Sequence, residues 1–151
     1  MRDRIMAALK AAKSSGDGTR LSTLRLMCAA IRDREAARRS GDDGEAVLDD
    51  AEIQEILGKM IRQREDSIRR YEESGRLELA EEERAEAEVI REFLPRPLSD
   101  DEMRRAVREA IAETKASSLR DMGAVMKRLK TRFPGRMDVC KAGAEVRSAL
   151  G

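Results

Sequence analysis

Basic side chains collect in one short stretch near the C-terminal end of the chain. Residues 127–141 contain six Lys or Arg residues and one acid, Asp138, so their local net charge is +5. The pairs at 127 and 130 and at 128 and 132 have the spacing of neighbouring turns of one helix. Such a cluster can bind phosphate oxygens, which makes it the candidate nucleic-acid contact. Its members are Lys127, Arg128, Lys130, Arg132, Arg136 and Lys141.

The same charges have a second interpretation. A charged run is often only a solvated helix face, on which each base is balanced by an acid one turn away. Residues 72–102 carry the opposite excess, with twelve acids and four bases, and residues 32–39 hold a weaker basic cluster. The whole chain has 31 bases and 30 acids, a net charge of +1, so we expect no global attraction to nucleic acid or membrane.

The residue types give little support to hydrolytic or redox chemistry. The chain has no His, which excludes a Ser-His-Asp triad, a Cys-His pair and a His-containing zinc site. Cys28 and Cys140 lie far apart in the sequence, and we expect both to be reduced packing residues. The sequence has no Gly-rich phosphate loop, and we expect neither a metal nor a cofactor.

The location of the protein is predicted from what the sequence lacks. No apolar run approaches the ~20 residues that span a bilayer. The apolar stretch after Met1-Arg2-Asp3-Arg4 is too short and interrupted for a signal peptide. We therefore expect a cytoplasmic protein without a membrane partner.

The elements that carry these residues are predicted to be helices throughout. Apolar residues recur at helical spacing, and no stretch alternates as a strand would. Pro95 and Pro97 force extended backbone, so they mark a boundary between two lobes. The prediction is an all-α fold, with an N-terminal four-helix lobe (1–94) followed by a small C-terminal three-helix lobe (95–151).

Local signals predict where several helices begin and which residues face inward. The start signals are the capping boxes Asp49–Glu52 and Ser99–Glu102, a serine at 117 or 118, and Asp138. The residues expected to face the core include Leu79, Leu119 and Val139. Residues 42–45 are expected to form an acidic loop.

Gly123 falls inside a predicted helix, where it costs about 1 kcal/mol relative to Ala. Its presence indicates the close approach of another helix or of a ligand backbone. We favour helix packing of these two interpretations.

A dense set of residues resembles a family signature. It starts at Gln63-Arg64-Glu65-Asp66-Ser67-Ile68 with Tyr71, continues through Gly75-Arg76 and Leu79-Ala80-Glu81, and reaches Phe93-Leu94-Pro95. The pattern resembles the GatB/YqeY family, whose YqeY members are free-standing relatives of the tail domain of GatB, a component of the tRNA-dependent amidotransferase. The resemblance extends through Ser117-Ser118, Asp121-Met122-Gly123, Val125-Met126 and Gly135-Arg136, and so covers nearly the whole chain.

This resemblance implies an all-helical protein of two lobes, whose C-terminal lobe is similar to the amidotransferase tail. In the amidotransferase that tail is associated with docking tRNA, while the catalytic cradle lies in a larger region with no counterpart among these 151 residues. Many relatives have a compact Asp-Gly-Lys after Gly135-Arg136, whereas here Val139-Cys140 separate Asp138 from Lys141.

Three functions remain open at this point. We expect a non-catalytic accessory protein that binds tRNA phosphates or a complex similar to the tRNA amidotransferase. The alternative is an adaptor that docks a protein through the acidic face of residues 72–92 or through the Met-bearing helices. The possible partner-binding residues are Gln63, Arg64, Tyr71, Arg76 and Gly123. Arg64 and Arg76 could equally form ion pairs with Glu83 and Glu86. Glutamine-dependent carbon–nitrogen ligation is the least favoured, because no nucleophile with its base is visible.

Overall fold

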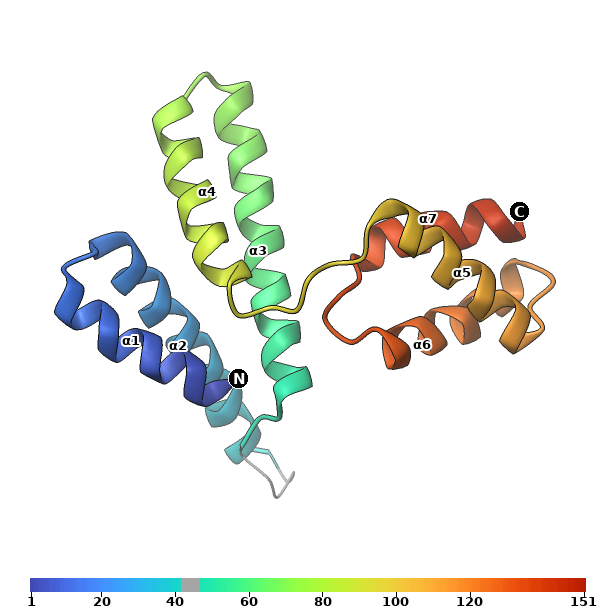
Figure 1. Cartoon of the computed structure of the whole chain (residues 1–151), viewed down its shortest axis with the longest axis horizontal. Helices are drawn as coiled ribbons and strands as arrows, with labels where there is room; N and C mark the ends of the chain where they lie inside the picture. Colours follow the sequence, from blue (N-terminus) through green and yellow to red (C-terminus); the bar gives the residue numbers. More distant parts are fainter. Residues whose placement is uncertain (42–46) are drawn as a thin grey trace. The chain divides into compact units, whose positions relative to one another are not determined.

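The computed structural model describes residues 1–41 and 47–151 (Figure 1). The acidic loop expected at 42–45 lies outside the described residues. Across the residues described, the backbone is helical and contains no strand, which confirms the all-α prediction. The helices are α1 (Arg2–Ser15), α2 (Gly18–Arg39), α3 (Asp50–Glu73), α4 (Leu77–Arg91), α5 (Asp100–Thr114), the short 3-10 helix η1 (Leu119–Asp121), α6 (Met122–Arg132) and α7 (Val139–Leu150).

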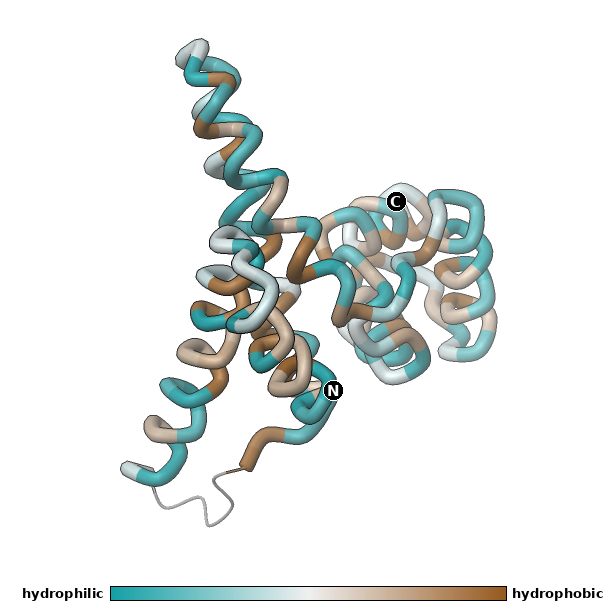
Figure 2. The backbone as a smooth tube through the Cα atoms, turned by 60° about the vertical axis from the view of Figure 1, so that its left-hand side comes forward, coloured by the Kyte–Doolittle hydropathy of each residue, from teal (hydrophilic) through white to brown (hydrophobic). Residues whose placement is uncertain are grey.

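The chain packs as two compact units, Met1–Leu94 (unit 1) and Pro95–Gly151 (unit 2). In unit 1, α1 packs against α2, and α3 packs against α4 (Figure 1). The core of unit 1 takes buried side chains from all four helices, among them Ile5, Leu24, Met27, Ile53, Leu57 and Ile90. Hydrophobic and hydrophilic residues alternate along each helix in Figure 2, as amphipathic helices require.

Two of the predicted helix starts are confirmed in atomic detail. The Asp49 carboxylate accepts a hydrogen bond from the Glu52 N–H at 2.9 Å, and the Glu52 carboxylate accepts one from the Asp49 N–H at 2.9 Å. Ser99 and Glu102 form the same reciprocal pair at 3.2 and 3.3 Å. Each box satisfies backbone donors that the first turn of a helix otherwise leaves unpaired.

A buried carboxylate ties three segments of unit 1 together. Glu35 on α2 is 8% exposed; it forms an ion pair with Arg2 of α1 and accepts a hydrogen bond from the Leu48 N–H at 3.3 Å. Burial acts to raise the pKa of Glu35, but the hydrogen bond from Leu48 and the Arg2 guanidinium outweigh it, so the pKa is lowered.

In unit 2, α5, α6 and α7 pack against one another around a second core. Its fully buried side chains include Val107, Val125, Leu129 and Val146. The segment that precedes α5 is joined to the turn after α6, because the Leu98 N–H donates to the Arg136 carbonyl at 2.8 Å.

Several apolar residues that the helical spacing predicts to face the core are exposed to solvent instead. Leu79 is 36% exposed, because α4 buries the adjacent Ala80 near its N-terminal end. Leu119 is 54% exposed, because it lies in η1, where three residues per turn change the phase of the apolar stripe. Val139 is 42% exposed because it is the first residue of α7, at the end of the helix.

The two cysteines have different environments. Cys28 is buried in the core of unit 1, as expected. Cys140 is exposed, so the expectation that it packs in a core is wrong. Its position in the first turn of α7, before the buried Ala142, explains the exposure.

Candidate nucleic-acid interface

The faces of α6 divide the four basic candidates on this helix into two kinds. Val125 and Leu129 are buried against the rest of unit 2, which fixes the orientation of the helix. With 3.6 residues per turn, Lys127 and Lys130 then lie on the side of α6 opposite this core. Both lysines are exposed.

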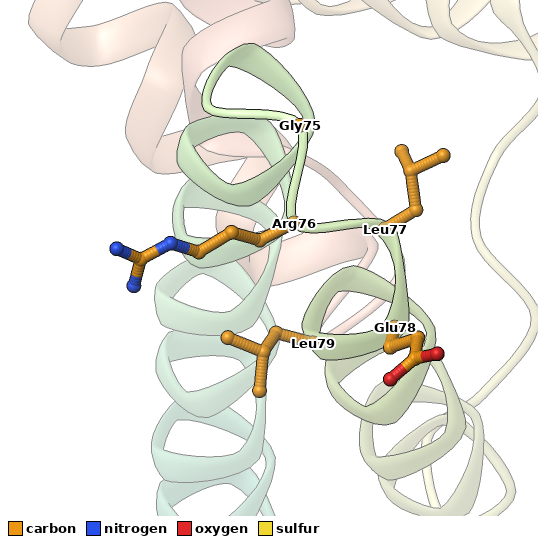
Figure 3. A pocket seen from close by; sticks show the side chains of 5 residues that line it. All are labelled: Gly75, Arg76, Leu77, Glu78 and Leu79. Atoms are coloured by element: carbon orange, nitrogen blue, oxygen red, sulfur yellow. The ribbon is translucent and has the colours of Figure 1, made fainter.

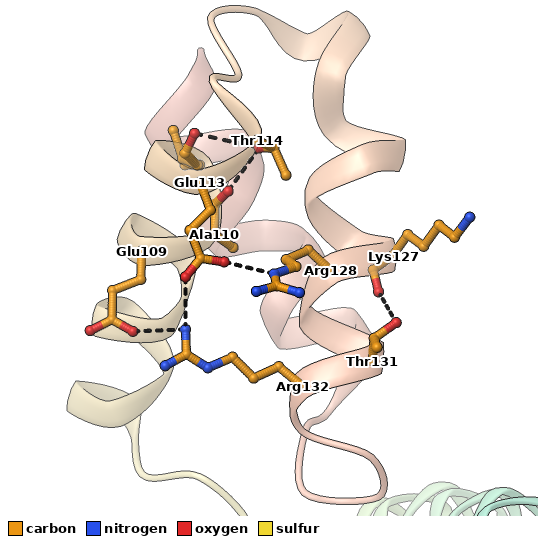
Figure 4. Close-up of polar contacts among 9 residues, drawn as sticks. Glu109, Ala110, Glu113, Thr114, Lys127, Arg128, Thr131 and Arg132 are labelled. Atoms are coloured by element: carbon orange, nitrogen blue, oxygen red, sulfur yellow. Dashed lines mark hydrogen bonds and ion pairs between the residues drawn. The ribbon is translucent and has the colours of Figure 1, made fainter.

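The arginines of α6 lie beside acids of α5 (Figure 4). Arg128 Nε donates to the Glu113 carboxylate at 2.6 Å, and Arg132 is 3.1 Å from Glu109 and 3.3 Å from Glu113. The hydrogen bond from Arg128, with the charge of Arg132, lowers the pKa of Glu113. Two of the six bases are therefore balanced by acids, and these acids lie on the neighbouring helix α5.

Arg136 is also engaged within unit 2. Its Nε donates to the Arg96 carbonyl at 2.9 Å, and its guanidinium lies 3.9 Å from the Glu102 carboxylate and 6.0 Å from the centre of the Phe133 ring. These contacts join the segment before α5 to the turn after α6. The side chain therefore stabilises the unit, and its positive charge is partly balanced.

Of the six basic candidates, the three lysines have no ion-pair partner among the described residues. Within the described residues, no carboxylate forms an ion pair with Lys127, Lys130 or Lys141, although Arg128, Arg132 and Arg136 are paired. Figure 4 shows the Lys127 side chain directed away from Glu109 and Glu113. Fewer basic residues are thus available to a ligand than the six that the sequence places between residues 127 and 141.

Gly123 does not pack against another helix. A Cβ atom placed on this residue would have no described neighbour within 4 Å, so the expected close helix packing is wrong. Helical geometry places Gly123 on the outer side of α6, about one turn before Lys127 and two turns before Lys130. At Gly143 of α7, a Cβ atom would meet Met122 Cε at 3.5 Å, which is an ordinary van der Waals contact.

Two backbone N–H groups in the first turn of α7 are already hydrogen-bonded within the protein. The Asp138 carboxylate accepts hydrogen bonds from the Cys140 N–H at 2.9 Å and the Lys141 N–H at 3.2 Å. Asp138 is therefore the predicted cap of this helix. Because these two donors are satisfied and the cap is negative, the helix start is a poor anion site.

Basic residues on other parts of unit 2 were not predicted from the sequence. The unit has thirteen Lys or Arg residues and eight Asp or Glu residues, a net charge of +5. Arg105 and Arg108 are exposed on α5, and Lys115 follows that helix in a left-handed conformation with φ 55°. The sequence could have identified these two arginines as exposed, because they lie outside the buried apolar face formed by Met103, Val107 and Ala110.

The candidate partner-binding residues are distributed over both units. Arg64 is paired with Glu86 at 3.1 Å and donates to the Met60 carbonyl at 3.1 Å, so it joins α3 to α4. Gln63 is exposed and Tyr71 is half-buried on α3. Arg76 lies at the turn between α3 and α4 and extends away from Leu77 (Figure 3). Gly123 belongs to unit 2.

Metal-binding groups and membrane-spanning helices are both absent from the described residues. In the part of the chain that the structure describes, no three His, Cys, Asp or Glu side chains are grouped so that they could hold a metal ion. No described helix is both long enough and apolar enough to cross a membrane.

Comparison with known proteins identifies two curated relatives and one matching family model. Two curated relatives, from Clavispora lusitaniae and Lachancea thermotolerans, are both named "Altered inheritance of mitochondria protein 41, mitochondrial". The first is 31% identical over 80% of this chain and 69% of its own length, and the second is 31% identical over 57% and 43%. The family model described as "Yqey-like protein" matches residues 2–150. This chain therefore belongs to the Yqey-like protein family.

Proposed function

We propose that this protein is a non-catalytic accessory protein that binds the phosphate backbone of tRNA through unit 2. The observation that carries the proposal is the outer face of α6, where Lys127 and Lys130 follow the open Gly123 at one and two turns and have no ion-pair partner among the described residues. The class of RNA follows from the family resemblance, because the related amidotransferase tail is associated with docking tRNA.

The physical argument separates the lysines from the arginines. A lysine ammonium that replaces a condensed counterion at a phosphate adds favourable entropy to binding. Arg128 and Arg132 would first have to leave Glu109 and Glu113, and those carboxylates would then repel the phosphate. The absence of a side chain at Gly123 lets an RNA backbone approach the helix closely. The lysine face is therefore the proposed contact.

The experiment measures the fluorescence anisotropy of labelled total tRNA with the full chain over a series of salt concentrations. We expect log affinity to fall linearly with log salt, with a slope of about −0.7 to −0.9 for each phosphate contacted. Double-stranded DNA of similar length is the control, and tRNA should bind more tightly. Absence of binding at low salt would refute the proposal.

A pair of triple variants tests which face is used. Lys127→Gln, Lys130→Gln and Lys141→Gln together should reduce the salt slope by about 2 to 3. The matched control, Arg105→Gln, Arg108→Gln and Lys115→Gln, removes the same charge from the same unit. Equal weakening by both triples would show that general electrostatic attraction, and not the α6 face, accounts for binding.

A protein adaptor is the second candidate, because of two exposed leucines at the end of the α3–α4 hairpin. Leu77 is 64% exposed and Leu79 is 36% exposed, and with Gly75, Arg76 and Glu78 they line a cavity of about 470 Å³ (Figure 3). An adaptor should form a complex that survives nuclease treatment and is lost in the Leu77→Ser, Leu79→Ser variant. An amidotransferase or another tRNA-handling protein is the proposed partner.

We propose the cytoplasm as the place of this function, as expected from the sequence. The names of the two relatives contain the word "mitochondrial", which describes those proteins. Imaging of the fluorescently tagged full-length protein in its own cells would decide between the two compartments.

A further inference from the structure

A groove between α1 and α2 gathers basic residues that no part of the proposed interface includes. It is lined by Leu9 and Lys13 of α1 and by Arg25, Cys28 and Arg32 of α2, and its volume is about 370 Å³. This volume lies within the range of small-molecule sites. The groove therefore combines a cavity of ligand size with three positive charges.

The helical positions explain how the groove forms. Leu9 and Lys13 are one turn apart on α1, and residues 25, 28 and 32 follow one face of α2 at the spacing i, i+3 and i+7. The two arginines are separated by about 10 Å along the helix axis. Leu9 and Cys28 are 7% and 6% exposed and form an apolar floor, while the three basic side chains surround it.

The basic side chains that line the groove differ in their ion pairing from several other basic residues of α1 and α2. None of Lys13, Arg25 and Arg32 forms an ion pair with a described residue. Other arginines of the same two helices do: Arg2 is paired with Glu35, Arg20 with Glu92 and Arg38 with Glu52. Uncompensated cations around one cavity repel one another, and a bound anion removes that repulsion.

Two of the three basic residues of the groove also act on the thiol at its floor. Burial raises the pKa of Cys28, and the positive charges of Arg32, Arg2 and Lys13 oppose that increase. Arg32 and Lys13 line the groove, so an anion there would be held in part by charges that already act on this buried atom. Cys140, in unit 2, is exposed and provides no equivalent environment.

We propose that the α1–α2 groove binds a phosphate group. Its oxygens accept hydrogen bonds from the guanidinium groups of Arg25 and Arg32 and from the Lys13 ammonium, and the organic part of the ligand packs on Leu9 and Cys28. Guanidinium groups suit this role because their planar donors match phosphate oxygens in pairs. The phosphate is carried either by a small organic molecule of nucleotide size or by an RNA backbone.

The test follows backbone amide signals of the full-length protein in ¹⁵N–¹H correlation spectra. Adenosine monophosphate and inorganic pyrophosphate are the small probes, and a single-stranded hexauridylate is the RNA probe. We expect saturable shifts confined, within unit 1, to residues 9–13 and 25–32. The Lys13→Gln, Arg25→Gln, Arg32→Gln variant should weaken binding of the effective probe at least about tenfold, because three charge-assisted contacts are lost.

The matched control is Lys10→Gln, Arg34→Gln, Arg39→Gln, which removes three exposed charges from the same helices outside the groove. Saturable groove shifts with a small probe support a free phosphate ligand, and groove shifts with RNA alone support an RNA phosphate. No groove shifts with any probe, or equal weakening by the two triples, overturns the proposal. The amide shifts that test the groove are those of unit 1. Failure of the groove proposal is therefore distinguishable from failure of the proposed tRNA contact of unit 2.

Discussion

Replacement of Gly123 by Ala is expected to stabilise unit 2. A helical glycine costs about 0.5–1 kcal/mol relative to alanine, because its backbone loses more freedom on folding. A Cβ atom at this position meets no described atom within 4 Å, so no steric penalty offsets the gain. We therefore expect Gly123→Ala to raise the free energy of unfolding of unit 2 by about 0.5–1 kcal/mol.

The assay is thermal unfolding of the full chain, followed by differential scanning calorimetry. For a domain of the size of unit 2, this gain corresponds to a rise in its transition temperature of about 2 to 8 °C. Gly143→Ala is the comparison at a buried glycine of the same unit, where the Cβ atom would make an ordinary van der Waals contact with Met122 Cε at 3.5 Å. A decrease in the unfolding free energy of Gly123→Ala would refute the inference that the position is open.

The same position connects stability to the proposed function. If RNA approaches α6 at Gly123, larger side chains there should weaken tRNA binding while the fold stays intact. Gly123→Leu should therefore lower tRNA affinity in the anisotropy assay, whereas Gly58→Leu on α3 of unit 1 should not. Unchanged tRNA affinity in Gly123→Leu would remove this glycine from the proposed contact.

Three further predictions concern the folded units. Asp138→Ala should lower the free energy of unfolding of unit 2 by about 1 kcal/mol in urea titrations, because two N–H groups of α7 lose their acceptor; an unchanged midpoint would contradict the capping role. Leu24→Ala should cost unit 1 about 2–5 kcal/mol, because this side chain is fully buried; a loss below about 1 kcal/mol would show that the site is not well packed. Glu35→Gln should cost about 1 kcal/mol at neutral pH by removing the ion pair with Arg2. Because the folded pKa of Glu35 is lowered, its contribution is complete above the ordinary pKa of a glutamate and is lost as the pH falls through the folded value. Urea midpoints of the two proteins should therefore converge in acid, and a difference that persists there would contradict the assigned role of the ion pair.

The sequence determined the helices because their signals are local. The capping boxes at Asp49 and Ser99 require only residues three positions apart, and Gly75 ends its helix with a left-handed φ of 74°. Apolar spacing likewise identified the buried faces of α1, α2 and most of α3, since the period of a helix is fixed by its own backbone. Errors occurred at helix ends such as Leu119 and Val139, where the regular period does not apply.

Tertiary structure alone decided which cations remain available for a ligand. Arg128 and Lys127 are neighbours in the sequence, yet one is neutralised by Glu113 and the other has no ion-pair partner among the described residues. The difference depends on which side of α6 faces α5, because Arg128 and Glu113 are 15 residues apart and no local pattern specifies that packing. The α1–α2 groove has the same origin, because Lys13 and Arg25 meet only when two separate helices pack. The α5–α6 ion pairs and the α1–α2 groove join residues of different helices, so they follow from the packing of helices and not from the helices themselves.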